Sequence, residues 1–491
     1  MESAPIRLQI DPLRTTGRRI DPNLYGQFAE HLGRCVYPGL WVGDSSPIAN
    51  DHGLRLDVIS ALKTLELPVV RWPGGCFADN YHWLDGVGDR SQRPRRHNLW
   101  WKQPENNAFG TDEFMTFCRL IDTEPYLVVN VGSGSVQEAI NWMEYCNSNQ
   151  DTEFTALRKK HGFNEPYNVR YWGIGNESWG CGGKMRPEVY ADLYRRFAAY
   201  LRPMGGRDVR LIACGSYPDF PDWDERFLAA MQGALDHVDL LALHIYSGWM
   251  GEEVNFSNQE YYQLFAAIDI MDRHLRRASE LVTAFSTADH RIGLALDEWG
   301  VWHRQAVVEN GLQQQNTLRD ALFAAASFHL FHRYAGTLEM ANMAQTVNVL
   351  QALIHTRGDR IVLTPTFHVF DLLKPHRNGQ LLDFDFSPLP MIDFPDQRQR
   401  PALSLSATIT KDGSIFISLI NIDLERSFAV ECRMINALHK IRSIRLLSAE
   451  DPREHNSFDL PHAITPREVE PSGDEVIQVP PHSLMTLSLQ A

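Results

Sequence analysis

Long apolar runs are missing from this 491-residue sequence. No stretch of about 18 apolar residues occurs, so the sequence predicts no helix that crosses a membrane. The first ten residues also lack the charged and then apolar pattern of a signal peptide, and we expect an intracellular, cytoplasmic protein. With 44% hydrophobic residues and a mean hydropathy of -0.30, the chain can nevertheless bury a large core.

Positive charge is also scarce. Lys and Arg total 47 against 61 Asp and Glu, and the net charge of -14 argues against nucleic acid as a partner. The seven cysteines show no CxxC or His/Cys spacing typical of zinc, and we expect most of them to be reduced and buried. The glycine-rich segments 132–134 and 180–183 lack the consecutive Lys and Ser/Thr that a P-loop needs, and no GxGxxG motif is present. We therefore predict neither a metal nor an organic cofactor.

Eight strand-like runs alternate with helical segments along the first three quarters of the chain. The strands are expected at residues 24–32, 67–75, 126–131, 169–179, 209–215, 238–246, 291–299 and 336–345. The helices are expected near residues 54–65, 111–120, 136–146, 186–202, 223–235, 260–285, 316–334 and 365–373, the seventh of them capped by Asn316. Strict alternation requires right-handed crossovers and a parallel sheet, and eight such units predict an α/β protein with a (β/α)8 TIM barrel.

The pattern changes near Lys374, where short runs of period two replace the helices. Residues 403–410 and 414–421 flank Asp412-Gly413, which is the sequence of a β-hairpin, and further strands are expected near 428–435, 441–447 and 483–489. We predict an all-β sandwich of jelly-roll type, completed by an N-terminal strand at residues 5–10. The predicted domains are the catalytic barrel at 18–375 and the sandwich at 1–17 plus 376–491.

Two of the barrel strands end in a glutamate. Glu177 follows an apolar run from Val169, and Glu298 follows another from Arg291. Either residue alone is equally well explained as a loop residue in a salt bridge. The two together lie at the strand ends where a barrel carries its catalytic groups, and glycoside hydrolysis requires such a pair of carboxylates.

Two further features favour a site at this end of the barrel. Arg71 lies inside an otherwise apolar strand, where a buried arginine needs a carboxylate partner. The long polar insertion at residues 79–110 contains Trp83, Trp100 and Trp101, and we interpret it as a wall around the site.

Six motifs carry a resemblance over nearly the whole chain to the α-L-arabinofuranosidases of glycoside hydrolase family 51. They are Tyr25-Gly26 with Glu30-His-Leu-Gly33, Arg71-Trp-Pro-Gly-Gly-Cys76, Trp172-Gly-Ile-Gly-Asn-Glu177, His244-Ile-Tyr246, Asp297-Glu-Trp299 and Ala341-Asn-Met-Ala-Gln345. The resemblance implies a retaining, exo-acting enzyme that releases terminal arabinofuranose from arabinan, arabinoxylan or arabino-oligosaccharides. It also implies a homohexamer.

The resemblance further implies a role for each site residue. Glu177 would be the general acid/base and Glu298 the nucleophile. Arg71 and Tyr246 would hold Glu298, and His244 would lie near Glu177. The sugar would be bound by Glu30, Asn176 and Gln345, between the apolar walls of Trp101 and Trp302 and beside Cys76. Gly300 stands where the family pattern predicts asparagine, and it receives no role.

Three alternatives remain open at the level of the sequence. The same fold and glutamate pair would serve a retaining β-xylosidase or an endo-β-1,4-glucanase, and a barrel without activity could still bind sugar.

Cys76 and Cys181 each follow a strand end at the same rim, so we expect their side chains to lie close together. They would form a disulfide or remain neighbouring thiols, and an intracellular setting favours thiols.

Overall fold

A closed parallel barrel forms the larger part of the structure. The computed structural model describes residues 5–206, 208–249, 251–436, 440–470 and 476–490, so residues 1–4 of the segment examined for a signal peptide lie outside it. Going around the barrel, the order is β10-β11-β12-β13-β2-β5-β8-β9, and every neighbouring pair is parallel. The strands are β2 (Gly26–Phe28), β5 (Val69–Trp72), β8 (Glu124–Val129), β9 (Tyr171–Ile174), β10 (Arg210–Ala213), β11 (Leu240–Ser247), β12 (Gly293–Val301) and β13 (Leu338–Ala344). The predicted TIM barrel is confirmed.

The barrel strands are mostly shorter than predicted because their final residues leave the sheet to form the rim. The helices that follow them are α1 (Leu56–Leu65), α2 (Thr111–Ile121), α3 (Val136–Asn147), α5 (Pro187–Gly205), α6 (Trp223–Ala230), α7 (Asn258–Phe285), α8 (Leu318–Arg333) and α9 (Pro365–Leu373). The short helix α4 (Glu153–Lys160) and the hairpin of β14 (Ile354–Arg357) and β15 (Arg360–Leu363) were not predicted.

The predicted cap of α8 is wrong. Thr317 occupies the cap position, and its backbone N–H donates to Asp320 Oδ2 at 2.9 Å. The Asn316 side chain donates instead to the carbonyl of Leu350 at 3.1 Å. Asp320 therefore satisfies a buried backbone donor at the start of the helix, which leaves Asn316 available to tie the helix to a loop.

The C-terminal strands and the N-terminal strand share one hydrogen-bonded sheet. Its order is β23-β22-β25-β20-β19-β16-β1-β21-β24. The strands are β1 (Ile6–Arg19), β16 (Gln380–Ser387), β19 (Leu403–Ile409), β20 (Ile415–Asn421), β21 (Phe428–Met434), β22 (Lys440–Leu447), β23 (Arg467–Val469), β24 (Val476–Val479) and β25 (Ser483–Gln490). The sheet folds back on itself, since β24 at one end contacts β20 near the middle. The predicted sandwich is thus one continuous sheet.

Strand β1 lies inside this sheet, not at its edge. Residues 6–10 pair in parallel with 430–434 of β21, and the same strand pairs antiparallel with β16. Alternate side chains Ile6, Leu8 and Ile10 are buried, as the period of two predicted. The pairing continues to Arg19, beyond residue 17. We propose the division into residues 18–375 and residues 1–17 plus 376–491 as the two folding units.

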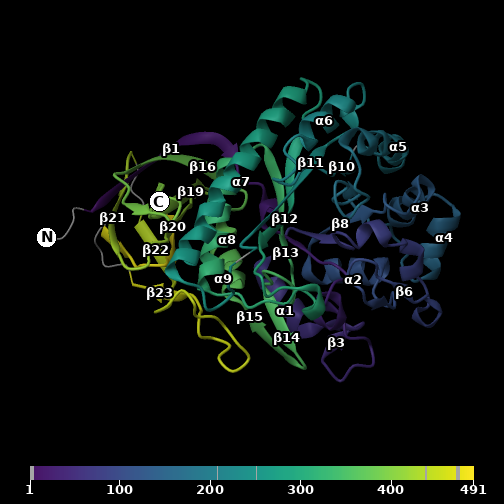
Figure 1. Cartoon of the computed structure of the whole chain (residues 1–491), viewed down its shortest axis with the longest axis horizontal. Coiled ribbons are helices and arrows are strands. Elements are labelled where there is room, and N and C mark those ends of the chain that lie inside the picture. Colours follow the sequence, from purple (N-terminus) through teal and green to yellow (C-terminus); the bar gives the residue numbers. More distant parts are fainter. Residues whose placement is uncertain (1–4, 207, 250, 437–439, 471–475, 491) are drawn as a thin grey trace.

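Helices α7, α8 and α9 lie between the sheet and the barrel strands (Figure 1). Helix α8 contacts β19, β20 and β25 of the sheet on one side and α9 on another. Nearly all of its residues are buried, which is why its sequence shows little amphipathic contrast. No helix among the described ranges is both long and apolar enough to cross a bilayer.

Candidate active site

A pocket of about 570 Å³ opens at the carboxyl ends of the barrel strands. In a parallel barrel all strands present these ends to one rim, so residues far apart in sequence converge there. The residues that line it include Glu30, Cys76, Trp101, Glu177, Tyr246, Glu298, Trp302 and Gln345. The pocket thus brings together eight of the eleven predicted site residues, and the other three, Arg71, Asn176 and His244, contact its glutamates or one another.

Glu177 stands on a tight turn beyond β9. The strand ends at Ile174, and Gly175 and Glu177 both have positive φ, of 78° and 41°. A positive φ is uncommon for a residue with a side chain and persists where the surroundings hold it. Asp79 supplies part of that support, because its Oδ2 accepts the backbone N–H of Asn176 at 2.9 Å.

Glu298 lies within β12, at a point where the pairing with β11 shifts register. The Arg71 guanidinium donates to Glu298 Oε1 at 2.7 Å, and the Tyr246 hydroxyl donates to Oε2 at 2.8 Å. Arg71 also donates to Asn176 Oδ1 at 2.6 Å and lies 3.4 Å from Asp297 Oδ2. Two donors on separate strands therefore hold both carboxylate oxygens and orient the group.

His244 lies between the two glutamates. Its Nδ1 is 2.9 Å from Glu177 Oε1 and 3.5 Å from Glu298 Oε2, and its Nε2 is 3.2 Å from Asp297 Oδ1. Burial lowers the pKa of His244, but the carboxylates of Glu298, Asp297 and Glu177 outweigh it and raise the value to about 10. The ring is therefore a cation at neutral pH, with carboxylate oxygens next to both of its nitrogens.

Burial sets the protonation of Glu177. Loss of hydration raises its pKa above the ordinary value, the hydrogen bond from His244 opposes this, and the charge of Glu298 adds to the rise. For Arg71, burial lowers the pKa, yet the charges of Asp297 and Glu298 raise it above its usual range. Arg71 therefore stays charged beneath Glu298.

Glu30 forms the opposite wall of the pocket. Its Oε1 accepts from the Phe77 backbone and from Trp101 Nε1, both at 3.0 Å, and its Oε2 accepts from Gln345 Nε2 at 3.3 Å. Burial, with the charge of Glu298, raises the pKa of Glu30 to about 7. Trp302 closes the far side, with its ring centroid 4.4 Å from that of Trp249.

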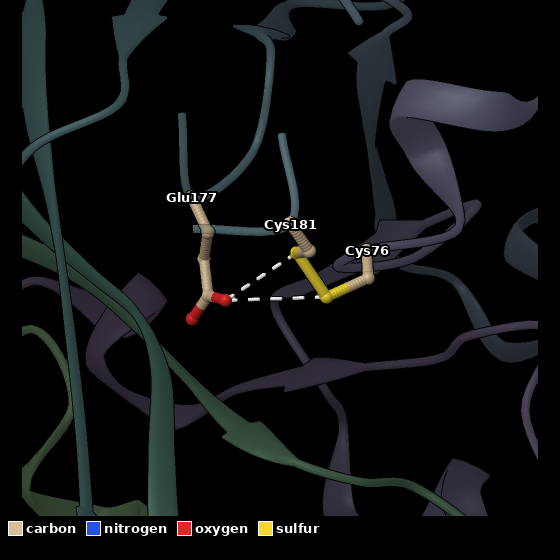
Figure 2. Close-up of side chains that lie close together, drawn as sticks. All are labelled: Cys76, Glu177 and Cys181. Carbon is tan, nitrogen blue, oxygen red and sulfur yellow. Dashed lines mark hydrogen bonds between the residues drawn. A yellow bond between two sulfur atoms is a disulfide. The ribbon is translucent and has the colours of Figure 1, made fainter. Parts of the chain in front are cut away.

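Cys76 and Cys181 form a disulfide at the pocket rim, with their Cα atoms 5.6 Å apart. Figure 2 shows the bridge beside the Glu177 carboxyl group. The expected proximity is confirmed, but the structure has the disulfide instead of the favoured thiols, because the loops after β5 and β9 bring the two side chains to bonding distance. Four other cysteines are free and buried, as expected: Cys35, Cys118, Cys146 and Cys214.

Comparison with known proteins identifies the fold and the site as those of one family. Residues 61–273 match the family description "Alpha-L-arabinofuranosidase 1 domain", and residues 297–483 match "Alpha-L-arabinofuranosidase C-terminal domain". The intracellular exo-α-L-arabinofuranosidase of Bacteroides ovatus is 41% identical, over 100% of this chain and 96% of its own. The chain belongs to the α-L-arabinofuranosidases. The enzyme is therefore a glycoside hydrolase, and the alternatives of a xylosidase, a glucanase or an inactive barrel are not favoured.

Solved structures place the enzyme in glycoside hydrolase family 51. The family 51 arabinofuranosidase of Xanthomonas axonopodis pv. citri superposes with a TM-score of 0.94 at 36% identity, covering 99% of this chain and 100% of the other. The α-L-arabinofuranosidase of Thermotoga maritima, solved as an arabinose complex, gives a TM-score of 0.88 at 33% identity, with 98% and 99% covered.

Two buried carboxylates of the enzyme, Asp297 and Asp79, were not among the predicted site residues. Asp297 accepts from the Tyr126 hydroxyl at 2.8 Å and contacts both Arg71 and His244. Asp79 accepts from the backbone of Val131, Gly132 and Asn176 and so joins the rims of three neighbouring strands. The sequence contains one sign of the role of Asp297, since it is a second acidic residue in an otherwise apolar strand. Asp79 lies among many polar residues of the insertion, where nothing distinguishes it.

Proposed function

We propose that the enzyme is a retaining, exo-acting α-L-arabinofuranosidase in which Glu298 is the nucleophile and Glu177 the general acid/base. The observation that carries the proposal is the spacing of the pair. One oxygen of Glu177, one of Glu298 and a His244 nitrogen all lie within 4.8 Å of one another. Retaining glycosidases keep their carboxyl groups about 5 Å apart, whereas inverting enzymes leave about 6.5–9.5 Å for a water molecule.

In the proposed reaction Glu298 attacks C1 of the arabinofuranosyl unit while Glu177 protonates the departing oxygen. The C1–O bond to the leaving group breaks, and an ester between C1 and Glu298 forms. Glu177, now a carboxylate, removes a proton from water as the water attacks C1. The ester breaks, arabinose leaves with its configuration retained, and both glutamates return to their first state.

The charges of the site support this division of work. A general acid must be protonated before the bond breaks, and burial raises the pKa of Glu177. A nucleophile must be ionised, and Arg71 and Tyr246 both donate to Glu298. The positively charged His244 ring donates a hydrogen bond from Nδ1 to Oε1 of Glu177. The acidic proton is therefore carried by Oε2, on the side of the disulfide.

The sugar hydroxyls are proposed to bind Glu30, Asn176 and Gln345. Asn176 Oδ1 accepts from Arg71, and its Nδ2 donates one hydrogen to Cys181 Sγ at 3.7 Å. The second hydrogen of Nδ2 is left for the 2-hydroxyl of the sugar, a contact that strengthens in the transition state. Trp101 and Trp302 provide apolar walls for the ring, and Cys76 lies beside it. The aromatic and carboxylate walls suit one terminal sugar unit.

Product analysis tests the proposal. Incubation with linear and branched arabinan should release arabinose only, and proton spectra recorded in the first minutes should show the α-anomer. Early accumulation of longer oligosaccharides would contradict exo-action. Initial formation of the β-anomer would contradict retention.

The location and assembly of the enzyme are further parts of the proposal. The relative from Bacteroides ovatus is named as intracellular, and we extend that location to this chain. The resemblance to the family implies a homohexamer. Light scattering should then give about six times the chain mass of 56.0 kDa, and a mass near 56.0 kDa would remove the idea.

A further inference from the structure

The Cys76–Cys181 disulfide lies beside the proposed sugar site, yet the proposed reaction gives it no chemical step. Figure 2 shows both sulfur atoms turned toward one oxygen of Glu177. Glu177 Oε2 is 3.5 Å from Cys181 Sγ and 4.0 Å from Cys76 Sγ, while Oε1 takes the hydrogen bond from His244. The two oxygens of the acid/base therefore meet different partners, an imidazolium on one side and a pair of sulfur atoms on the other.

A disulfide sulfur carries no hydrogen. No N–H or O–H group of the described ranges is hydrogen-bonded to Oε2, so this oxygen has no protein donor while the bridge is intact. A protonated Oε2 can still donate its own hydrogen to sulfur, which is a weak acceptor. The bridge thus suits the neutral carboxyl group better than the carboxylate.

We propose that the Cys76–Cys181 disulfide is a redox-sensitive positioning element that keeps Glu177 in its acid form, and that its reduction weakens the enzyme as a general acid. The inference rests on the proposed function of Glu177. A dithiol supplies two electrons and two protons, the S–S bond breaks, two thiols form, and the dithiol closes to its own disulfide. Each new S–H group is a donor within reach of Oε2, and donation to the carboxylate favours ionisation.

The bridge is open to such a reagent. Cys76 and Cys181 are both partly exposed, and Cys76 lines the pocket, whereas the other five cysteines are buried. A small thiol therefore reaches this pair before any other cysteine of the described chain. Reduction also releases the loop between Glu177 and Cys181 from the turn that follows β5, so the two effects must be separated by experiment.

The test compares kcat/KM across pH for arabino-oligosaccharides, whose leaving group needs a proton, with the oxidised and the dithiothreitol-reduced enzyme. We expect reduction to move the alkaline limb of the profile down by about 0.5–1 pH unit, the effect of one weak hydrogen bond to the carboxylate. A nitrophenyl arabinofuranoside should show a smaller change, because nitrophenolate leaves without a proton. Mass spectrometry after alkylation confirms that both thiols have formed.

The matched control is the double variant C76A/C181A, which has neither a bridge nor an S–H donor. Its alkaline limb should stay near that of the oxidised wild type, and dithiothreitol should not affect it. The proposal is overturned if the reduced wild type keeps the oxidised profile, or if the double variant shifts as far as the reduced enzyme, since loss of the tether alone would then explain the change. An enzyme that fails to hydrolyse the arabinofuranosides in either state contradicts the proposed function instead.

Discussion

Buried histidines are charged in one region of the molecule and neutral in another. At the barrel mouth, His244 faces Glu177, Asp297 and Glu298, and its pKa rises to about 10. Between the barrel and the sheet, His376 faces the hydroxyls of Thr408 and Ser418, and burial lowers its pKa to about 3.

Two neighbouring histidines on α8 behave like His376. His329 contacts Ser404 and Ser418, His332 contacts Ser406 and Tyr25, and the pKa of each lies well below its usual value because of burial. Burial alone therefore makes a histidine neutral, and only carboxylate neighbours reverse the outcome. The neutral histidines lie where the barrel joins the sheet, and the charged histidine lies at the catalytic glutamates.

Removal of Glu298 should have the largest effect on the difference between the charged and the neutral histidines. Glu298→Ala deletes the nucleophile, so turnover of every arabinofuranoside should fall by at least about 10,000-fold. It also deletes the charge that contributes most to the raised pKa of His244, so that pKa should fall. Rate measurements and an NMR titration of the His244 ring check both effects. Exposed Glu280 on α7 is the control, since Glu280→Ala should change neither; substantial activity in Glu298→Ala would contradict the assignment.

Removal of Glu177 should separate the substrates. Glu177→Ala should lose roughly 100- to 10,000-fold on arabinan, where the leaving group needs a proton, while kcat/KM for a nitrophenyl arabinofuranoside falls less. The covalent intermediate should then accumulate, because no base activates water. Added azide should attack it and give a glycosyl azide of retained configuration. An azide product of inverted configuration would show that the two glutamates have been assigned the wrong way round.

A substitution at Asp79 tests how strongly catalysis at the barrel mouth depends on a carboxylate that does not contact the substrate. Asp79→Asn places an amide NH₂ opposite either the backbone N–H of Asn176 or those of both Val131 and Gly132, so the turn that carries Glu177 should move. We expect kcat to fall by up to about 100-fold. KM should change much less. Asp85→Asn, in the same insertion but paired only with Arg96, is the control; equal losses in both variants would remove the positioning role of Asp79.

The smallest effect should come from the neutral histidines, as acid sensitivity. In the unfolded chain the His376 side chain is protonated below about pH 6.5, whereas in the folded chain it is protonated only near pH 3. The free energy of unfolding therefore falls as pH falls through this window. The slope is about 1.4 kcal/mol per pH unit for one histidine. His376→Gln should reduce the slope by that amount in urea titrations between pH 6.5 and 4.5. His52→Gln, at an exposed ring beside Asp51, should leave the slope unchanged.

The sequence predicted the strands of the barrel and the two glutamates for the same reason. A buried parallel strand is a run of apolar residues, so an acid that ends the run, such as Glu177, is easily recognised. The bonded state of Cys76 and Cys181 could not be predicted, because it depends on loop geometry across β8. Asp79 was missed because its function comes from three backbone donors, and backbone groups leave no trace in the sequence.

The same limit applies to the β-rich part of the chain. The hairpin of β19 and β20 was predicted because a short turn that contains Asp412-Gly413 joins its strands. The order of the other strands depends on pairings between distant segments, so the inner position of β1 could only be expected in outline. Helix α4, with a polar sequence and only two buried residues, offered no apolar stripe to recognise.

The inner position of β1 has a consequence for the synthesis of the protein. Residues 6–10 emerge from the ribosome early, yet their partners at 384–387 and 430–434 are made near the end. At about 5–20 residues per second, the first strand waits for tens of seconds with its hydrogen-bonding groups unpaired. The barrel strands are complete by residue 344, so the larger part of the enzyme can fold while its first strand is still free. A newly made chain therefore passes through a stage with an open strand that neighbouring copies can pair with, which makes crowded synthesis the step at which aggregation threatens this fold most.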